Sequence, residues 1–156
     1  MTGPGTRVPE EVDEASAVDI LIIDDDPDDV YLIRRAFGRV HDITGPTTIE
    51  TAVNGQDALD RLRARVSRND ALPDVIVLDL NMPLMDGPTF LRHMWDEAAF
   101  ADVPVVVLTT ADNPKLGTNF FLGRVLRVLA KTDTVAELDD LATQIVACAR
   151  AESGQR

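Results

Sequence analysis

The stretch VDILIIDDDPDD, residues 18–29, joins an apolar run to five aspartates that a single proline interrupts. A short run rich in branched aliphatic residues is typical of a β-strand buried on both faces of a parallel sheet. Asp26 precedes Pro27, and an aspartate followed by proline is a common start of an α-helix, with the acid as N-cap. The stretch therefore predicts a strand that passes directly into a helix.

The same alternation continues along the chain. Three further apolar runs predict buried strands over 75–78, 103–108 and 125–130, and a run diluted by Thr and Glu predicts an edge strand over 47–53. The spacing of apolar residues predicts covering helices between and after the strands, over 27–40, 55–68, 87–97, 113–122 and 134–151. Alternating strands and helices indicate right-handed βαβ units, and hence an α/β fold with a parallel sheet.

Length and charge limit the classes of function. The chain has 156 residues, 45% of them hydrophobic and 27% charged, which suits one globular domain. We expect this domain over 18–151, between a disordered acidic tail at 1–17 and a short tail at 152–156. The net charge of −12 argues against binding to nucleic acid or anionic lipid. The chain lacks a secretory pattern and any apolar run of about 18 residues, so we expect a cytoplasmic protein with no membrane contact.

Polar side chains follow the predicted strands at their carboxyl ends, where folds of this class hold their ligands. They are Asp24, Asp25, Asp79, Thr109, Thr110 and Lys131. Helix capping and the helix dipole account for Asp26, Asp28 and Asp29 but not for Asp24 and Asp25. Clustered carboxylates raise one another's pKa or bind a cation, and oxygen ligands suit Mg²⁺. A carboxylate beside Mg²⁺, with an ammonium and a hydroxyl opposite, indicates phosphoryl transfer to an aspartate.

Other chemistry has little support in the sequence. Phosphate-binding loops, serine-hydrolase elbows, dinucleotide fingerprints and Cys-x-x-Cys motifs are absent. His41 and His93 are isolated, and we interpret both as surface or packing residues. Cys148 falls in the apolar stripe of the last predicted helix, which indicates an inert core thiol.

The ordered motifs closely resemble the receiver domain of two-component response regulators, from residue 18 to about residue 150. The matching segments are ILIIDDDP (20–27), TAVNGQDAL (51–59), DLNMPLMDG (79–87), VVVLTTA (105–111) and LAK (129–131). The resemblance implies a flavodoxin-like, doubly wound, five-stranded parallel sheet in the order 2-1-3-4-5, with five helices. It also implies a site where the first and third strands diverge.

Carried over to this chain, the resemblance implies that Asp79 accepts a phosphoryl group from a histidine of a sensor histidine kinase. It implies that Asp25 and Asp79 bind Mg²⁺ directly, that Asp24 acts through water, and that the Asn81 backbone carbonyl is a further ligand. Slow hydrolysis of the aspartyl phosphate is implied as well, in a signalling protein that is otherwise not an enzyme.

The same resemblance gives Thr109 a hydrogen bond to a phosphoryl oxygen and Lys131 an ion pair with another. Two positions depart from the family pattern. Thr132 stands where a proline with a cis peptide usually follows the lysine, so we expect a trans peptide here. Val128 stands where many members have an aromatic residue that moves with the threonine. We expect phosphorylation to survive both changes and its readout to differ.

A narrower resemblance concerns small stand-alone regulators that partner phytochrome-type kinases. It rests on the Asp26-Pro27 start, the LDLNMP segment (78–83) and the absence of proline after Lys131. We expect no output domain, because only six residues follow Arg150. The signal is then expected to leave through protein contacts, or by transfer of the phosphate to another histidine protein.

Apolar residues near the end of the chain admit two interpretations. They are Phe120, Phe121, Val125 and Leu126. One interpretation is a partner or homodimer surface over the predicted helix 113–122, the strand 125–130 and the helix 134–151. The other is ordinary core packing.

Two other functions remain open at this point. Asp24-x-Asp26, Thr109 and Lys131 occur in the order used by haloacid-dehalogenase-like phosphatases, but that reading leaves Asp79 unexplained. The second alternative is a degenerate receiver that serves as a constitutive binding module. The two departures from the family pattern favour it, and the intact acceptor, metal and lysine positions oppose it.

Overall fold

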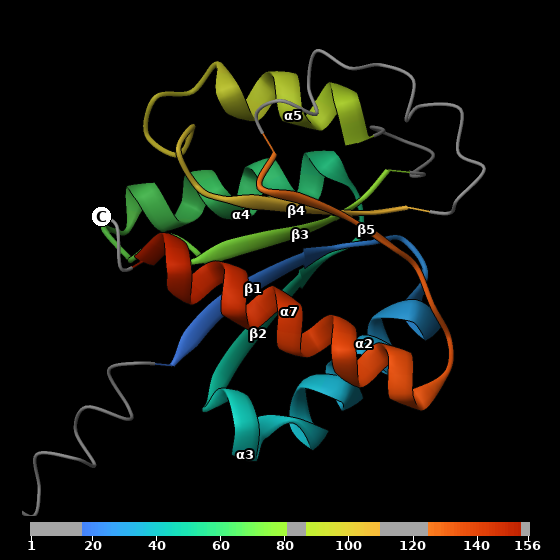
Figure 1. The fold of residues 1–156 in the computed structure, drawn as a ribbon. Coiled ribbons are helices and arrows are strands. Elements are labelled where there is room, and N and C mark those ends of the chain that lie inside the picture. Colours follow the sequence, from blue (N-terminus) through green and yellow to red (C-terminus); the bar gives the residue numbers. More distant parts are fainter. Residues whose placement is uncertain (1–16, 81–86, 110–124, 154–156) are drawn as a thin grey trace, which may run out of the picture.

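A five-stranded parallel sheet forms the centre of the computed structural model, which describes residues 17–80, 87–109 and 125–153 (Figure 1). The strands are β1 (Val18–Ile23), β2 (Thr47–Ala52), β3 (Val75–Asp79), β4 (Val105–Thr109) and β5 (Arg127–Ala130). They lie in the order β2-β1-β3-β4-β5 with every pairing parallel, which confirms the predicted flavodoxin-like topology.

Five helices are described. Four were predicted: α2 (Pro27–Arg39), α4 (Gly55–Ser67), α5 (Gly87–Trp95) and α7 (Val135–Ser153). The fifth, α3 (His41–Thr44), was not predicted, because four residues are too few to show helical periodicity. The helix predicted over 113–122, with Phe120 and Phe121, lies outside the described residues. So do most of the N-terminal tail predicted over 1–17 and the last three residues of the chain.

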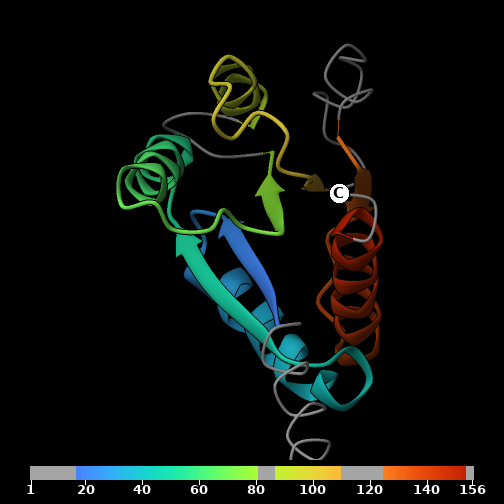
Figure 2. The same cartoon turned by 90° about the vertical axis from the view of Figure 1, so that its left-hand side faces the viewer.

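Helices cover both faces of the sheet, as its apolar strands require (Figures 1 and 2). α4 and α5 pack on one face, where the buried core includes Leu59 and Phe90. α2 and α7 pack on the other face, where it includes Phe37 and Ile145. The two apolar layers pack against both faces of β1 and β3. The positions of the residues that follow these strands are therefore well fixed.

Side-chain caps fix where the helices begin. The Asp26 carboxylate accepts a hydrogen bond from the Asp28 backbone N–H at 2.9 Å, and Pro27 occupies the first turn of α2, as predicted. Asn54 caps α4 by accepting from the Asp57 N–H at 2.8 Å. The junction from β1 to α2 is therefore short and fully specified by its own residues.

The two edge strands differ from each other in how well they were predicted. β2 lies at one edge, as the dilution of its apolar residues indicates. β5 lies at the other edge, and the prediction that it is buried on both faces is wrong: Val128 is 37% exposed, and Arg127 and Ala130 are exposed as well. The last strand of an open sheet has a strand neighbour on one side only, which an apolar run does not reveal.

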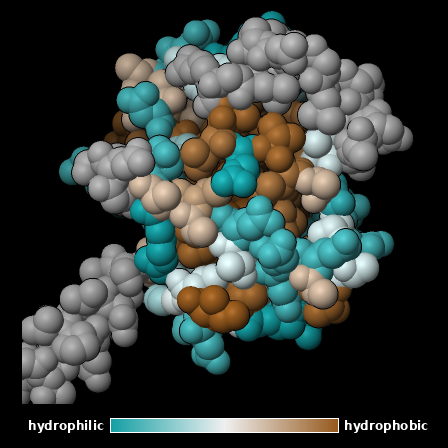
Figure 3. All heavy atoms as spheres, viewed as in Figure 1, coloured by the Kyte–Doolittle hydropathy of each residue, from teal (hydrophilic) through white to brown (hydrophobic). Residues whose placement is uncertain are grey.

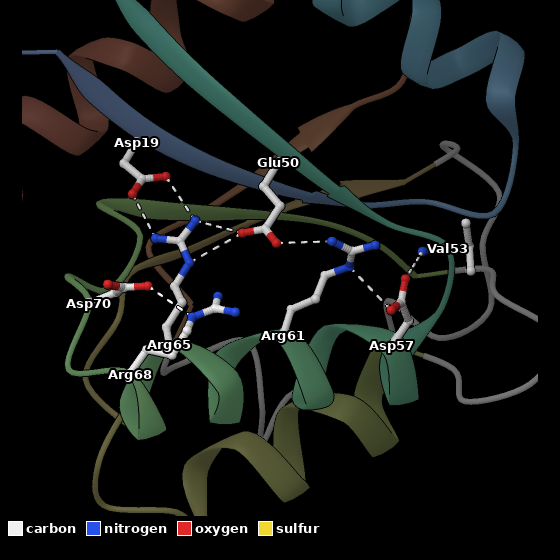
Figure 4. Close-up of polar contacts among 8 residues, drawn as sticks. All are labelled: Asp19, Glu50, Val53, Asp57, Arg61, Arg65, Arg68 and Asp70. Carbon is white, nitrogen blue, oxygen red and sulfur yellow. Dashed lines mark hydrogen bonds and ion pairs between the residues drawn. The ribbon is translucent and has the colours of Figure 1, made fainter.

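A group of charged side chains joins α4 to the edge of the sheet at β1 and β2 (Figure 4). We call it the α4 cluster, and its members are Asp19, Glu50, Asp57, Arg61 and Arg65. Arg65 binds Asp19 at 2.6 Å and Glu50 at 2.7 Å, while Arg61 binds Glu50 at 3.0 Å and Asp57 at 3.2 Å. Burial raises the pKa of Glu50, but the hydrogen bonds from Arg65 and Arg61 outweigh it and hold this pKa below its ordinary value.

None of the described helices combines the length and the apolar character needed to cross a bilayer.

Candidate functional site

Three aspartates meet at the carboxyl ends of β1 and β3. Asp24 and Asp25 follow β1, and Asp79 is the last residue of β3, which pairs with β1 in register up to Ile23 and Leu78. One carboxylate oxygen from each aspartate lies within 4.8 Å of the others. Asp24 and Asp79 are 7% and 3% exposed, whereas Asp25 is exposed to solvent. The sheet topology thus brings together residues that the sequence separates by some fifty positions.

The backbone around Asp24 explains its fixed position. Its N–H donates to the Ala52 carbonyl at 3.0 Å, which extends the β1–β2 ladder by one residue. Its Oδ1 accepts from the Asp26 N–H at 3.0 Å, inside the turn that leads to α2. Both contacts orient the buried carboxylate toward the end of the sheet.

Lys131 brings the positive charge of the site. It follows β5, and its N–H donates to the Thr109 carbonyl at 2.9 Å. Its Nζ lies 3.4 Å from Asp79 Oδ1, 3.5 Å from Asp24 Oδ2 and 2.9 Å from Asp29 Oδ2. We call Asp24, Asp25, Asp29, Asp79 and Lys131 the aspartate–lysine cluster. Burial lowers the pKa of Lys131, but the hydrogen bond to Asp29 and the nearby carboxylates outweigh burial, so this pKa is raised and the side chain stays an ammonium.

The cluster holds more negative than positive charge, and this affects Asp24. Burial raises the pKa of Asp24 to about 6, the charge of Asp79 adds to the effect, and the Asp26 N–H and Lys131 oppose it. A carboxylate in this condition gains from a cation that compensates the surplus charge. The close set of three oxygen donors, one of them open to solvent, therefore fits a hard divalent ion such as Mg²⁺ or Mn²⁺.

Of the three remaining predicted residues at this edge of the sheet, the structure describes Thr109. Thr109 ends β4 and is 3% exposed, next to β3 in the ladder that pairs Asp79 with Leu108. Asn81 lies outside the described residues, as does Thr110. The peptide between Lys131 and Thr132 is trans, as expected.

Asp29 is the residue of the cluster that sequence reasoning missed. It lies in the first turn of α2, where an acidic side chain is explained by the helix dipole alone. Its contact with Lys131 joins residues 102 positions apart. Helical geometry could have indicated this residue. In an α-helix the side chains tilt toward the N-terminal end, so the third residue after the N-cap is directed toward the strand ends.

Comparison with known proteins identifies the family. The model of the response regulator receiver domain matches residues 20–143. The chain belongs to this family. Receiver domains are signalling modules of two-component systems and partner histidine kinases, and the acidic group Asp24, Asp25 and Asp79 fits the phosphorylation and metal site of such a domain. The predicted family is thereby confirmed.

A curated relative supports the assignment. The probable methanogenesis regulatory protein FilR2 of Methanothrix harundinacea is 38% identical over 92 residues, which are 59% of this chain and 57% of FilR2. The chain spans about half the length, or less, of the curated relatives it first matches. The receiver domain is thus the part that they share.

Solved structures of response regulators are similar over most of the chain. The phosphorylated cyanobacterial phytochrome response regulator RcpA is 27% identical with a TM-score of 0.68, covering 83% of this chain and 91% of RcpA. The Mn²⁺-bound form of the response regulator Rcp1 is 25% identical with a TM-score of 0.65, covering 82% and 91%. The predicted similarity to phytochrome-associated regulators is therefore found in structure as well.

Proposed function

We propose that this receiver domain accepts a phosphoryl group on Asp79 from a phosphohistidine of a sensor histidine kinase, in a reaction that depends on Mg²⁺. The observation that carries the proposal is the position of Asp79, a buried carboxylate with two further carboxylates and one ammonium around it. In the α4 cluster, by contrast, each carboxylate is paired with an arginine of its own surroundings, and the arginines nearly match the carboxylates in number.

The chain's own residues have separate tasks in this reaction. An oxygen of Asp79 attacks phosphorus, and the new O–P bond forms as the P–N bond to the donor imidazole breaks. The electron pair of the broken bond stays on the imidazole nitrogen, which takes up a proton. The Lys131 ammonium, 3.4 Å from Asp79, compensates the negative charge of the phosphoryl oxygens, and the Thr109 hydroxyl donates a hydrogen bond to one of them.

Asp25 and Asp79 would bind the divalent ion directly and Asp24 would act through water. The resemblance adds the Asn81 carbonyl as a further ligand. When bound, the ion supplies positive charge to the phosphoryl oxygens and removes the repulsion among the carboxylates. Mg²⁺ is the ion we propose, because all the donors are oxygen atoms.

Intact-mass measurement after incubation with phosphoramidate, with and without Mg²⁺, tests the proposal. The wild-type chain is expected to gain one phosphoryl group only with Mg²⁺, and Asp79→Asn is expected to gain none. Asp57→Asn, which removes a carboxylate from the α4 cluster instead, is the matched control and should still be phosphorylated.

The other outcomes point to other functions. If the wild type gains no phosphate from phosphoramidate or from a panel of kinases, the proposal is wrong and a constitutive binding module is favoured. If the gain survives in Asp79→Asn but is lost in Asp24→Asn, the phosphatase alternative is favoured.

We also propose that the donor is a phytochrome-type kinase and that the chain has no enzymatic activity beyond slow hydrolysis of its own phosphate. The named similarity to RcpA supports the first point. Phosphotransfer from a purified phytochrome-type kinase should then be faster than from an unrelated sensor kinase. Equal rates from both would contradict the assignment.

A homodimer through β5 and α7 is part of the same proposal. Hydrophobic residues gather near the centre of the face seen in Figure 3. On β5, Val128 is 37% exposed. Light scattering before and after phosphorylation tests this, with Val128→Lys expected to reduce any dimer. A monomer in both states would contradict it.

A further inference from the structure

The closest partner of Lys131 is not the acceptor. Lys131 Nζ lies 2.9 Å from Asp29, within hydrogen-bond distance, and 3.4 and 3.5 Å from Asp79 and Asp24. Asp79 and Asp24 belong to strand ends, whereas Asp29 belongs to α2. The ammonium is thus held from the helix side and lies beside the acceptor.

The start of α2 fixes the backbone position of Asp29. This residue lies in the first turn of α2, whose start is set by the Asp26 cap and Pro27. Lys131 follows the short edge strand β5, and four rotatable side-chain bonds separate its ammonium from the backbone. A long, flexible side chain on an edge strand needs a partner to hold one geometry, because ordering it costs conformational entropy.

Among the described residues, the cavity behind the pair offers no charged substitute for Asp29 outside the cluster itself. A cavity of about 40 Å³ lies between α2, α7 and the sheet, behind the pair. Apart from the cluster itself and Thr132, its lining is apolar: Ile22, Ile23, Leu32, Ile33, Val77, Leu108, Leu138 and Leu141. An ammonium released by Asp29 cannot bind there, so it would turn to solvent or move toward the carboxylates of Asp24 and Asp79.

The helix dipole does not account for this contact. Asp28 lies beside Asp29 in the same first turn and carries the same charge. If only the charge at the helix end matters for phosphorylation, removing either carboxylate should have the same effect. If the hydrogen bond to Lys131 matters, only removal of the Asp29 carboxylate should have an effect.

We infer that Asp29 is a positioning residue that holds the Lys131 ammonium beside Asp79, where the phosphoryl oxygens arrive. The inference rests on the proposed phosphorylation of Asp79. Asp29 then acts on the reaction through Lys131 and does not itself touch the phosphoryl group. It links the start of α2 to the end of β5 across the site.

Phosphorylation kinetics of the full chain test the inference, with phosphoramidate as donor and saturating Mg²⁺. Asp29→Asn is expected to lower the rate at saturating phosphoramidate about tenfold, the loss typical of one charge-assisted hydrogen bond, with little change in KM. Asp28→Asn should stay within about twofold of the wild type, since it changes charge without this contact. Asp29→Glu, which keeps a carboxylate, should recover part of the rate.

A second readout follows the contact directly. The ¹⁵N signal of the Lys131 ammonium is expected to shift in Asp29→Asn and to stay unchanged in Asp28→Asn, with unfolding midpoints confirming that both variants are folded. Equal rates in the wild type and Asp29→Asn, or equal losses in the two asparagine variants, would overturn the inference and leave the proposed function intact. Absence of phosphorylation in the wild type would overturn both.

Discussion

The α4 cluster and the aspartate–lysine cluster use the same kinds of side chain in opposite ways. In the α4 cluster, three carboxylates face two arginines, and every member has a close partner of opposite charge (Figure 4). The aspartate–lysine cluster has four carboxylates and one ammonium, which lies close to three of them. The pKa of Glu50 is lowered in the first, whereas the pKa of Asp24 is raised to about 6 in the second. The α4 cluster, where the arginines nearly match the carboxylates in number, stabilises the fold, whereas the larger surplus of carboxylates in the aspartate–lysine cluster fits an incoming cation.

Removing the acceptor gives the largest expected difference between the clusters. Asp79→Asn should abolish phosphorylation, as measured by intact mass. Without metal it should also raise the free energy of unfolding by about 1 kcal/mol, because one of several crowded carboxylates loses its charge. Urea unfolding in EDTA measures this. A clear loss of stability would contradict the surplus of negative charge in the aspartate–lysine cluster.

Breaking the α4 cluster should have the reverse outcome. Arg65→Met leaves Asp19 and Glu50 without their shared, mostly buried partner, and we expect a loss of about 2 kcal/mol in the free energy of unfolding. The phosphorylation rate should change little. Arg68→Met is the matched control, because Arg68 pairs with Asp70 on the surface and should cost less than about 0.5 kcal/mol.

The two clusters should also respond to pH with opposite sign. The raised pKa of Asp24 contributes stability that is fully present below its ordinary value of 3.8 and is lost as pH rises through about 6. The lowered pKa of Glu50 contributes stability that is present above its ordinary 4.5 and is lost at lower pH.

Mg²⁺ should therefore stabilise the wild type more at pH 7 than at pH 5, because at pH 5 a proton competes for Asp24. We expect a difference on the order of 1 kcal/mol between the two pH values, measured as the shift in urea unfolding with and without the ion. Asp24→Asn should remove most of this pH dependence. Equal stabilisation at both pH values would contradict the raised pKa.

Matched helix caps give the smallest expected effects. Asp26→Ala and Asn54→Ala each remove the cap of one helix, α2 beside the aspartate–lysine cluster and α4 beside its own cluster. Each should cost about 1 kcal/mol of unfolding free energy. Only Asp26→Ala should also slow phosphorylation, since α2 carries Asp29. Equal phosphorylation rates in both variants would show that the start of α2 is not part of the site.

Local patterns predicted most of the fold and most of the candidate site. Apolar runs and caps located β1 and α2, and the rule that parallel strands share an edge selected Asp24, Asp25, Asp79 and Lys131. Contacts between distant segments were not predictable in this way. The hydrogen bond from Lys131 to Asp29 joins residues 102 positions apart. Each residue already had another role predicted from the sequence, Asp29 at the helix dipole and Lys131 at the phosphoryl group.

The α4 cluster was missed for a related reason. From the sequence, Arg65 lies on a charged helix face of the kind that is usually exposed to solvent. Its partner Asp19 lies 46 residues away, inside an apolar strand. The exposure of β5 was missed for a different reason. The resemblance implied the order 2-1-3-4-5, which places this strand at an edge, but the apolar run alone indicated burial on both faces.

Because Lys131 follows an edge strand, one side of the site is more rigid than the other. Asp79 ends a strand held by neighbours on both sides and by helices on both faces, so displacing it would disturb the whole core. β5 has four residues, one strand neighbour and exposed side chains, so it can shift at small cost. We therefore expect a charge added at Asp79 to be accommodated by a shift of β5 and not by a change in the core.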